Sequence, residues 1–160
     1  MGLFSFLKNA GAKILTKKAT SAAEDEETIR LREELEKRQK MILLRGVIDG
    51  LGIPIKNLEL DVNGDKVTIY GQAKSQSERE KVVLALGNVS GIGFVDDRIS
   101  VTRAAKEAEF YTVKRGDSLS KIAKRFYGDP MKYNKIFEAN KPMLKDPNKI
   151  YPGQMLRIPK

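Results

Sequence analysis

The 160-residue sequence predicts an α+β fold divided into two small domains. In residues 28–102 a long helical pattern precedes two stretches of alternating apolar and polar residues, and a second helix and a third strand follow. In residues 110–160 two short strands enclose two short helices. The orders α-β-β-α-β and β-α-α-β define the expected fold class, and residues 103–109 form the polar linker between the two domains.

The first residues predict a helix because their apolar side chains recur at intervals of three or four. These residues are Leu3, Phe4, Leu7, Ala10, Ile14 and Leu15. We expect a helix over residues 3–9 within a helical arm, residues 1–18, that packs on the first domain. A second interpretation is that this basic, amphipathic arm lies on an anionic bilayer. Residues 19–27 are expected to be a linker that ends in an acidic first helical turn.

The elements of the first domain follow from periodicity and from turn residues. A helix is expected from Thr28 to Gly50, after which Gly52 and Pro54 prevent its continuation. The strands at 58–62 and 67–70 alternate apolar and polar residues, and Asn63-Gly64 predicts a tight hairpin turn between them. A second helix is expected over residues 76–86, followed by a glycine-rich loop over 87–93 and a third strand over 94–101.

The second domain shows the same kinds of signal. Ser118 is a suitable N-cap for a helix over residues 118–126 that buries Leu119. A second helix should place Tyr133, Ile136 and Phe137 inward and end at Asn140, and a strand closes the domain.

Composition argues against an enzyme. The chain has no Cys and no His, which excludes disulfides, thiolate and imidazole metal ligands, and the usual nucleophile–base pairs. The net charge of +9 is uneven, at +4 for residues 1–20, −1 for 21–106 and +6 for 107–160. This distribution suits either an anionic partner or simple solubility. No nucleic-acid-binding motif accompanies the charge, so no nucleic-acid partner is expected.

The chain is expected to be cytoplasmic. Its start lacks the basic, then apolar, pattern of a secretory signal, because lysines interrupt the apolar residues that follow Leu7. No apolar run reaches 18 residues, so no transmembrane segment is expected.

The C-terminal domain resembles the LysM family. YTVKRGDSL at 111–119, Ala139-Asn140, and IYPGQMLRIP at 150–159 occur in the family's order. LysM domains commonly bind N-acetylglucosamine polymers such as peptidoglycan. The resemblance therefore implies a glycan groove lined by Gly116, Asp117, Ser118, Leu119, Ile150 and Tyr151. The chain has no Trp to stack on a sugar ring, so use of this domain as a structural or protein-interaction module remains the alternative.

Residues 28–102 resemble a BON domain, through Gly71, the Val89-Ser90-Gly91-Ile92 loop and Val95-Asp96-Asp97. Together with the opening Met-Gly-Leu-Phe and the segment 133–145, the whole chain resembles bacterial cytoplasmic potassium-binding proteins with one BON and one LysM domain. The charged helix within residues 21–50 is longer than that pattern needs.

The resemblance implies a K⁺ site formed by backbone carbonyl oxygens. Carbonyl oxygens replace the water shell of this weakly hydrated ion, and a helix C-terminus offers unpaired ones. The expected ligands come from the arm and from the loop: Leu7, Ala10, Ala12, Gly87, Val89 and Ile92. The implied function is a K⁺ sensor in which binding orders the BON domain and compacts the chain. LysM would either report this binding to a protein partner or stabilise the ion-bound form. The alternative is a cell-envelope protein that binds peptidoglycan through LysM.

Overall fold

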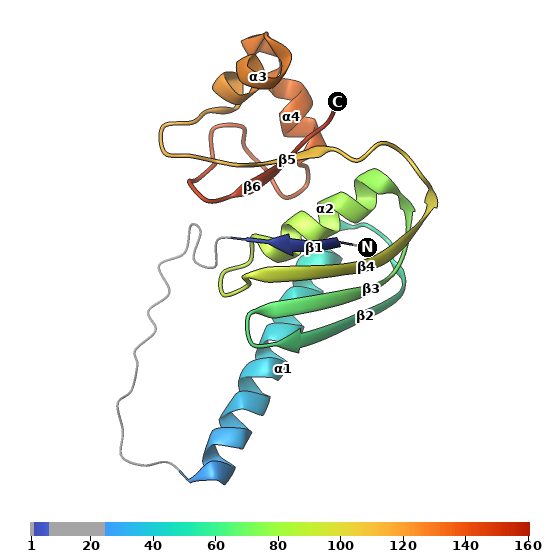
Figure 1. Cartoon of the computed structure of the whole chain (residues 1–160), viewed down its shortest axis with the longest axis vertical. Helices are drawn as coiled ribbons and strands as arrows, with labels where there is room; N and C mark the ends of the chain where they lie inside the picture. Colours follow the sequence, from blue (N-terminus) through green and yellow to red (C-terminus); the bar gives the residue numbers. More distant parts are fainter. Residues whose placement is uncertain (1, 7–24) are drawn as a thin grey trace.

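The computed structural model describes residues 2–6 and 25–160, which form two adjacent domains (Figure 1). The first contains β1 (Gly2–Ser5), α1 (Glu26–Leu51), β2 (Lys56–Asn63), β3 (Lys66–Ser75), α2 (Gln76–Gly87) and β4 (Phe94–Arg103). The second contains β5 (Glu109–Thr112), α3 (Leu119–Tyr127), the 3₁₀ turn η1 (Pro130–Lys132), α4 (Tyr133–Ala139) and β6 (Met155–Ile158). The predicted α+β class is confirmed.

The first domain is a four-stranded sheet with the order β1-β4-β3-β2. Strands β3 and β4 are parallel, and α2 makes the crossover between them, while β1–β4 and β2–β3 are antiparallel. Both helices pack on the sheet through one apolar core, which includes Leu44, Ile48, Val67, Ile69, Val82, Leu86, Val95 and Ile99. The crossover fixes the C-terminal end of α2 close to the start of β4.

The helix predicted for residues 3–9 is wrong where the structure describes it, because Gly2–Ser5 is a strand paired with β4. Phe4 and Phe6 face the core, whereas Leu3 is 63% exposed, so burial alternates with the period of a strand. The edge of β4 offers backbone hydrogen-bond partners to these residues. A strand can use these partners, whereas a helix would leave them unused. The rest of the expected arm and most of the expected linker lie outside the described residues.

The hairpin turn lies one residue later than predicted. Asn63 pairs with Lys66, so the two turn residues are Gly64 and Asp65. Gly64 has a φ of 61°, and a glycine with positive φ at the first central position is typical of a type II′ turn.

Helix α1 is longer than its packing requires. It begins after Asp25, whose side chain accepts from the N–H of Thr28 at 2.8 Å, and it buries Leu44 and Ile48 in its second half. Residues 26–39 are exposed and extend past the sheet (Figure 1). Lys40 ties this helix to the hairpin by donating to the carbonyl of Gly64 at 2.8 Å.

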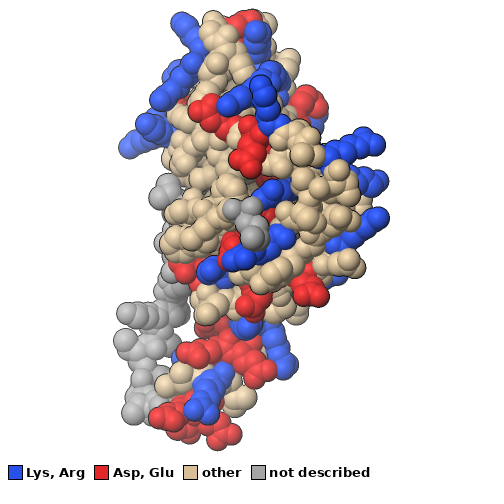
Figure 2. Space-filling model, turned by 45° about the vertical axis from the view of Figure 1, so that its right-hand side comes forward, with Lys and Arg blue, Asp and Glu red and all other residues tan. Residues whose placement is uncertain are grey.

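The second domain forms around the antiparallel pair β5–β6 and a separate core. Ser118 is the N-cap of α3, as predicted, and accepts from the N–H of Lys121 at 3.2 Å. Helix α4 buries Ile136 and ends at the C-cap Asn140, also as predicted. Lys and Arg side chains are numerous over this domain, at the top of the space-filling view (Figure 2). Within the described ranges, no helix combines the length and apolar character needed to cross a bilayer.

Candidate cation site

The loop that follows α2, residues 87–93, is the meeting point of the N-terminus and the first domain. After β1, the N–H of Phe6 donates to the carbonyl of Gly93 at 2.8 Å. The Phe6 ring is buried against Gly87, where an added Cβ would lie only 2.0 Å from a ring carbon. Gly87 is the last residue of α2 and does not have a positive φ. Glycine is required there because the Phe6 ring occupies the space that a larger side chain would fill.

Backbone hydrogen bonds define the shape of this loop. The N–H of Val89 donates to Leu86 at 3.1 Å, and the N–H of Ile92 donates to Val89 at 3.1 Å. The N–H of Gly93 then donates to Asp65 at 2.8 Å, which anchors the loop to the β2–β3 turn. Among the residues that the structure describes, none donates a hydrogen bond to the carbonyl oxygen of Gly87 or Ile92. The loop therefore offers carbonyl oxygens at the negative end of the α2 dipole.

Ser90 adds an unusual feature to the loop. Its hydroxyl oxygen is buried and has no hydrogen-bond partner among the described residues. A buried polar atom without a partner is costly, and such atoms in native structures often mark a bound water or ion. The hydroxyl is a neutral oxygen ligand of the kind that suits a monovalent cation. Sequence reasoning did not select Ser90, because a serine in a glycine-rich loop is ordinary.

The oxygens at this site are neutral. The described residues contain no group of three or more acidic side chains arranged to hold a metal. Ca²⁺ and Mg²⁺ sites rely on carboxylates, whereas K⁺ sites use carbonyl oxygens. Three of the six expected ligands, Gly87, Val89 and Ile92, belong to this one loop. The other three, Leu7, Ala10 and Ala12, lie outside the described residues.

Asn88, between two of these carbonyl residues, connects the loop to the second domain. Its amide nitrogen donates to the carbonyl of Met155 at 2.9 Å, and its amide oxygen accepts from the N–H of Met155 at 2.9 Å. Its own N–H donates to Leu84 and closes α2. No local sequence pattern indicates a contact between residues 67 positions apart.

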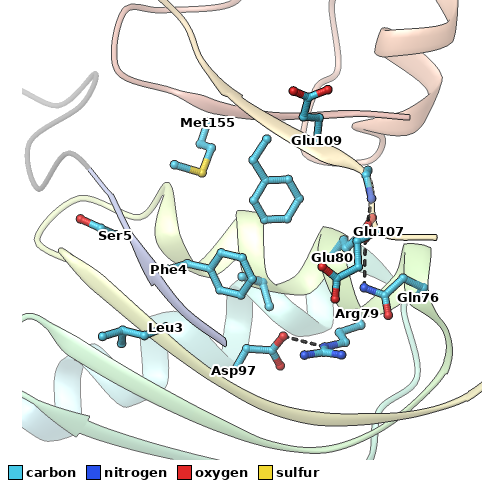
Figure 3. A pocket seen from close by; sticks show the side chains of 13 residues that line it. Leu3, Phe4, Ser5, Gln76, Arg79, Glu80, Asp97, Glu107, Glu109 and Met155 are labelled. Atoms are coloured by element: carbon cyan, nitrogen blue, oxygen red, sulfur yellow. Dashed lines mark hydrogen bonds and ion pairs between the residues drawn. The ribbon is translucent and has the colours of Figure 1, made fainter. Parts of the chain in front are cut away.

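Glu80, in the middle of α2, makes the second connection between the domains (Figure 3). It is 4% exposed and accepts from Gln76 and from the N–H of Ala108 in the linker, both at 3.0 Å. It also forms an ion pair with Arg157 of β6. Both oxygens of this buried carboxylate therefore have partners, since Gln76 and Ala108 donate to one and Arg157 to the other.

A cavity of about 420 Å³ lies beside this ion pair, between β1, α2, the linker and β6 (Figure 3). Phe4 and Phe110 line it with ring centroids 5.3 Å apart. Arg79 and Asp97 form an ion pair of 2.6 Å on its wall, and Asp97 also accepts from the N–H of Ile99. The charged groups that α2 and β4 contribute to this cavity, Arg79, Glu80 and Asp97, are thus paired within the protein.

The residues expected to line a glycan groove are largely used by the domain itself. Asp117 accepts from the hydroxyl of Tyr111 at 2.7 Å and from the N–H of Lys114 at 2.8 Å. Partial burial alone would raise the pKa of Asp117, but these hydrogen bonds outweigh it and hold that pKa below its usual value. Ser118 caps α3, and Leu119 is buried in the core.

The other side of the expected groove faces the first domain. Tyr151 lines a second cavity between the domains, of about 470 Å³, together with Val89 and Gln154. Burial raises the pKa of the Tyr151 hydroxyl. Ile150 packs at the margin of the second core, and Gly116 occupies a turn with a φ of 85°.

Comparison with known proteins agrees with both domains. The BON domain model matches residues 40–103, and the LysM domain model matches residues 111–159. The fold and its loops thus define a two-domain BON–LysM protein.

Among individual proteins, the chain is 44% identical over 160 residues to the potassium binding protein Kbp of Escherichia coli, with 99% of each chain covered. It belongs to the same family as Kbp. A protein of Deinococcus radiodurans is 38% identical over 118 residues, which cover 66% of this chain and 46% of that relative. YqbP of Bacillus subtilis is 42% identical over 67 residues, covering 36% and 31% of the two chains.

Proposed function

We propose that the protein binds K⁺ at the loop of residues 87–93, with the N-terminal arm completing the site. The observation that carries the proposal is the loop itself. The carbonyl oxygens of Gly87 and Ile92 and the buried hydroxyl of Ser90 have no hydrogen-bond partner among the described residues, and Phe6 packs against Gly87 at the start of this loop. The full-length similarity to a protein named for potassium binding supports the same ligand.

The ion would couple two segments that are far apart in sequence. The carbonyls of Leu7, Ala10 and Ala12 would supply the remaining oxygens, so that binding requires the arm to dock on the loop. Binding would thereby order the arm and the BON domain and compact the chain, which is the behaviour of a cytoplasmic K⁺ sensor. The LysM domain would present this state to a protein partner.

Calorimetry of the intact protein with KCl and NaCl at matched ionic strength tests the proposal. K⁺ at a hundredfold excess over Kd should stabilise the fold by about 2.7 kcal/mol, whereas equal NaCl should do much less. Ser90→Ala should weaken K⁺ binding. The matched control is Ser100→Ala, which removes an exposed hydroxyl that donates to Gly71 in the same domain. Indistinguishable heats and melting temperatures in the two salts would contradict the proposal.

Peptidoglycan binding is a second candidate because the LysM model matches residues 111–159. A single LysM domain lacks the avidity of repeated modules, so binding should be weak. Chemical-shift mapping with an N-acetylglucosamine oligomer should show small shifts confined to Asp117, Ser118 and Tyr151. Tight binding centred on these residues, with the protein found in the cell envelope, would rank this function above K⁺ binding.

A further inference from the structure

We propose that Asn88 is a positioning residue for the cation loop. Its side-chain amide sets the loop geometry by hydrogen-bonding to the edge of β6 that faces away from β5. Docking of the LysM domain and binding of the ion would then be one coupled equilibrium. This inference rests on the proposed K⁺ function and names the contact that regulates the same site.

Two asparagine side chains hydrogen-bond to the backbone groups on the outer edge of β6, the edge that faces away from β5. Alternate residues of a strand direct their backbone groups to opposite edges, so Met155 and Arg157 present theirs away from β5. Asn140, from the LysM domain, donates to the carbonyl of Arg157 at 2.8 Å and accepts from its N–H at 2.7 Å. Asn88, from the BON domain, makes the same pair of bonds with Met155. The LysM strand is thus completed from the first domain.

The hydrogen bonds between Asn88 and Met155 act directly on the cation loop. Asn88 is the C-cap of α2 and lies between Gly87 and Val89, whose carbonyls are proposed ligands. Both ends of its amide are used by Met155, so the side chain cannot rotate without losing two interdomain bonds. When the LysM domain is docked, the peptide groups on either side of Asn88 are held in one orientation. When it separates, the amide returns to water and these carbonyls lose that restraint.

Glu80 provides an internal comparison. It lies eight residues before Asn88 in α2, about 12 Å along the helix. Its ion pair with Arg157 and its bond from the N–H of Ala108 also hold the LysM domain, but they contact no residue of the loop. A change at Glu80 should release the loop only in the fraction of molecules that undock, whereas a change at Asn88 should release it in docked molecules as well.

The test is calorimetry of the full-length chain with KCl and NaCl, combined with small-angle X-ray scattering in both salts. Allosteric couplings of typical size change affinity by about 5–150-fold, so Asn88→Ala should raise the Kd for K⁺ by about tenfold. It should also lower the ratio of the Na⁺ Kd to the K⁺ Kd, because relaxed carbonyls discriminate less between ions. Glu80→Gln should increase the radius of gyration in KCl but lower this ratio less than Asn88→Ala does, because its docked molecules keep the Asn88–Met155 hydrogen bonds.

Ser75→Ala is the matched control. Ser75 caps the opposite end of α2 by accepting from the N–H of Glu78 at 3.2 Å, so its loss weakens the same helix without touching β6 or the loop. Its K⁺ affinity should stay within about twofold of wild type, since an N-cap contributes only to helix stability. Asn88→Gln, which keeps the amide but shifts it by one methylene, replaces Asn88→Ala if that variant does not fold.

Two results would overturn the inference: an Asn88 variant with wild-type Kd and selectivity, or an equal loss of affinity in Ser75→Ala. A wild-type protein that gives no heat with KCl would instead refute the proposed function. The two failures are therefore distinguishable.

Discussion

Substitution of Gly87 by alanine should undock the N-terminal strand. The added Cβ would lie 2.0–2.2 Å from three atoms of the Phe6 ring, far inside van der Waals contact. The ring must leave, because the other side of the contact is the backbone of α2. Phe6 is 8% exposed, and full burial of such a side chain is worth about 1.5–3 kcal/mol. The docking equilibrium of the arm should therefore shift by about 10–150-fold.

Hydrogen–deuterium exchange of the β1 amides measures this shift directly. The N–H of Phe6, which donates to Gly93, should lose protection by the same factor while the core strands keep theirs. Gly46→Ala is the matched control, because a Cβ there meets no atom within 4 Å and alanine favours the helix by up to about 1 kcal/mol. In the double variant with Phe6→Ala, the Gly87→Ala substitution should have almost no additional effect.

Unchanged exchange of the β1 amides in Gly87→Ala would refute this reasoning. So would additive effects in the double variant, since they would mean that Gly87 acts through its backbone and not through the space it leaves for Phe6.

Three further predictions concern the remaining parts of the chain. Leu119→Ala or Ile136→Ala should cost about 2–5 kcal/mol of LysM stability in thermal or urea unfolding, since both side chains are buried. The folded pKa of Asp117 lies below the usual value for an aspartate, so its stabilising contribution is complete above that usual pKa and is lost as the pH falls through the folded pKa. The melting temperature should therefore fall in acid for wild type, and less steeply for Asp117→Asn. Asp61→Asn should leave K⁺ heats unchanged, because this exposed carboxylate pairs with Lys37 at 3.0 Å; loss of binding would place the ion at the hairpin.

Local patterns predicted most elements because each is decided within a few residues. Ser118 and Asn140 delimit helices through their own side chains, and the strand alternation around the hairpin reflects one buried face. The helix predicted over residues 3–9 is wrong for residues 3–5, since a short apolar run fits a helix and a strand equally well and the edge of β4 decides the outcome. Gly87 was selected for its carbonyl, but its closeness to Phe6 depends on a packing that no local pattern records.

The interdomain contacts could not be predicted for a related reason. Glu80 and Asn88 look like ordinary polar residues of a surface helix, and their roles depend on Arg157 and Met155, which lie 77 and 67 residues later. No sequence pattern marks Ser90 as a ligand; only the structure shows that its hydroxyl is buried with no partner among the described residues. The family resemblance thus indicated the loop, while the residues that hold it required the three-dimensional structure.

The position of β1 at the edge of the sheet has a consequence for synthesis of the chain. Residues 2–5 leave the ribosome well before the strand with which they pair, which begins at Phe94, about ninety residues later. At about 5–20 residues per second, the N-terminus must wait roughly 5–20 s before its partner exists. Until it docks, the edge of β4 presents unpaired backbone groups of the kind that promote association between chains. Residues 2–5 are thus made long before they can fold, and they close the edge at which newly made molecules would otherwise aggregate.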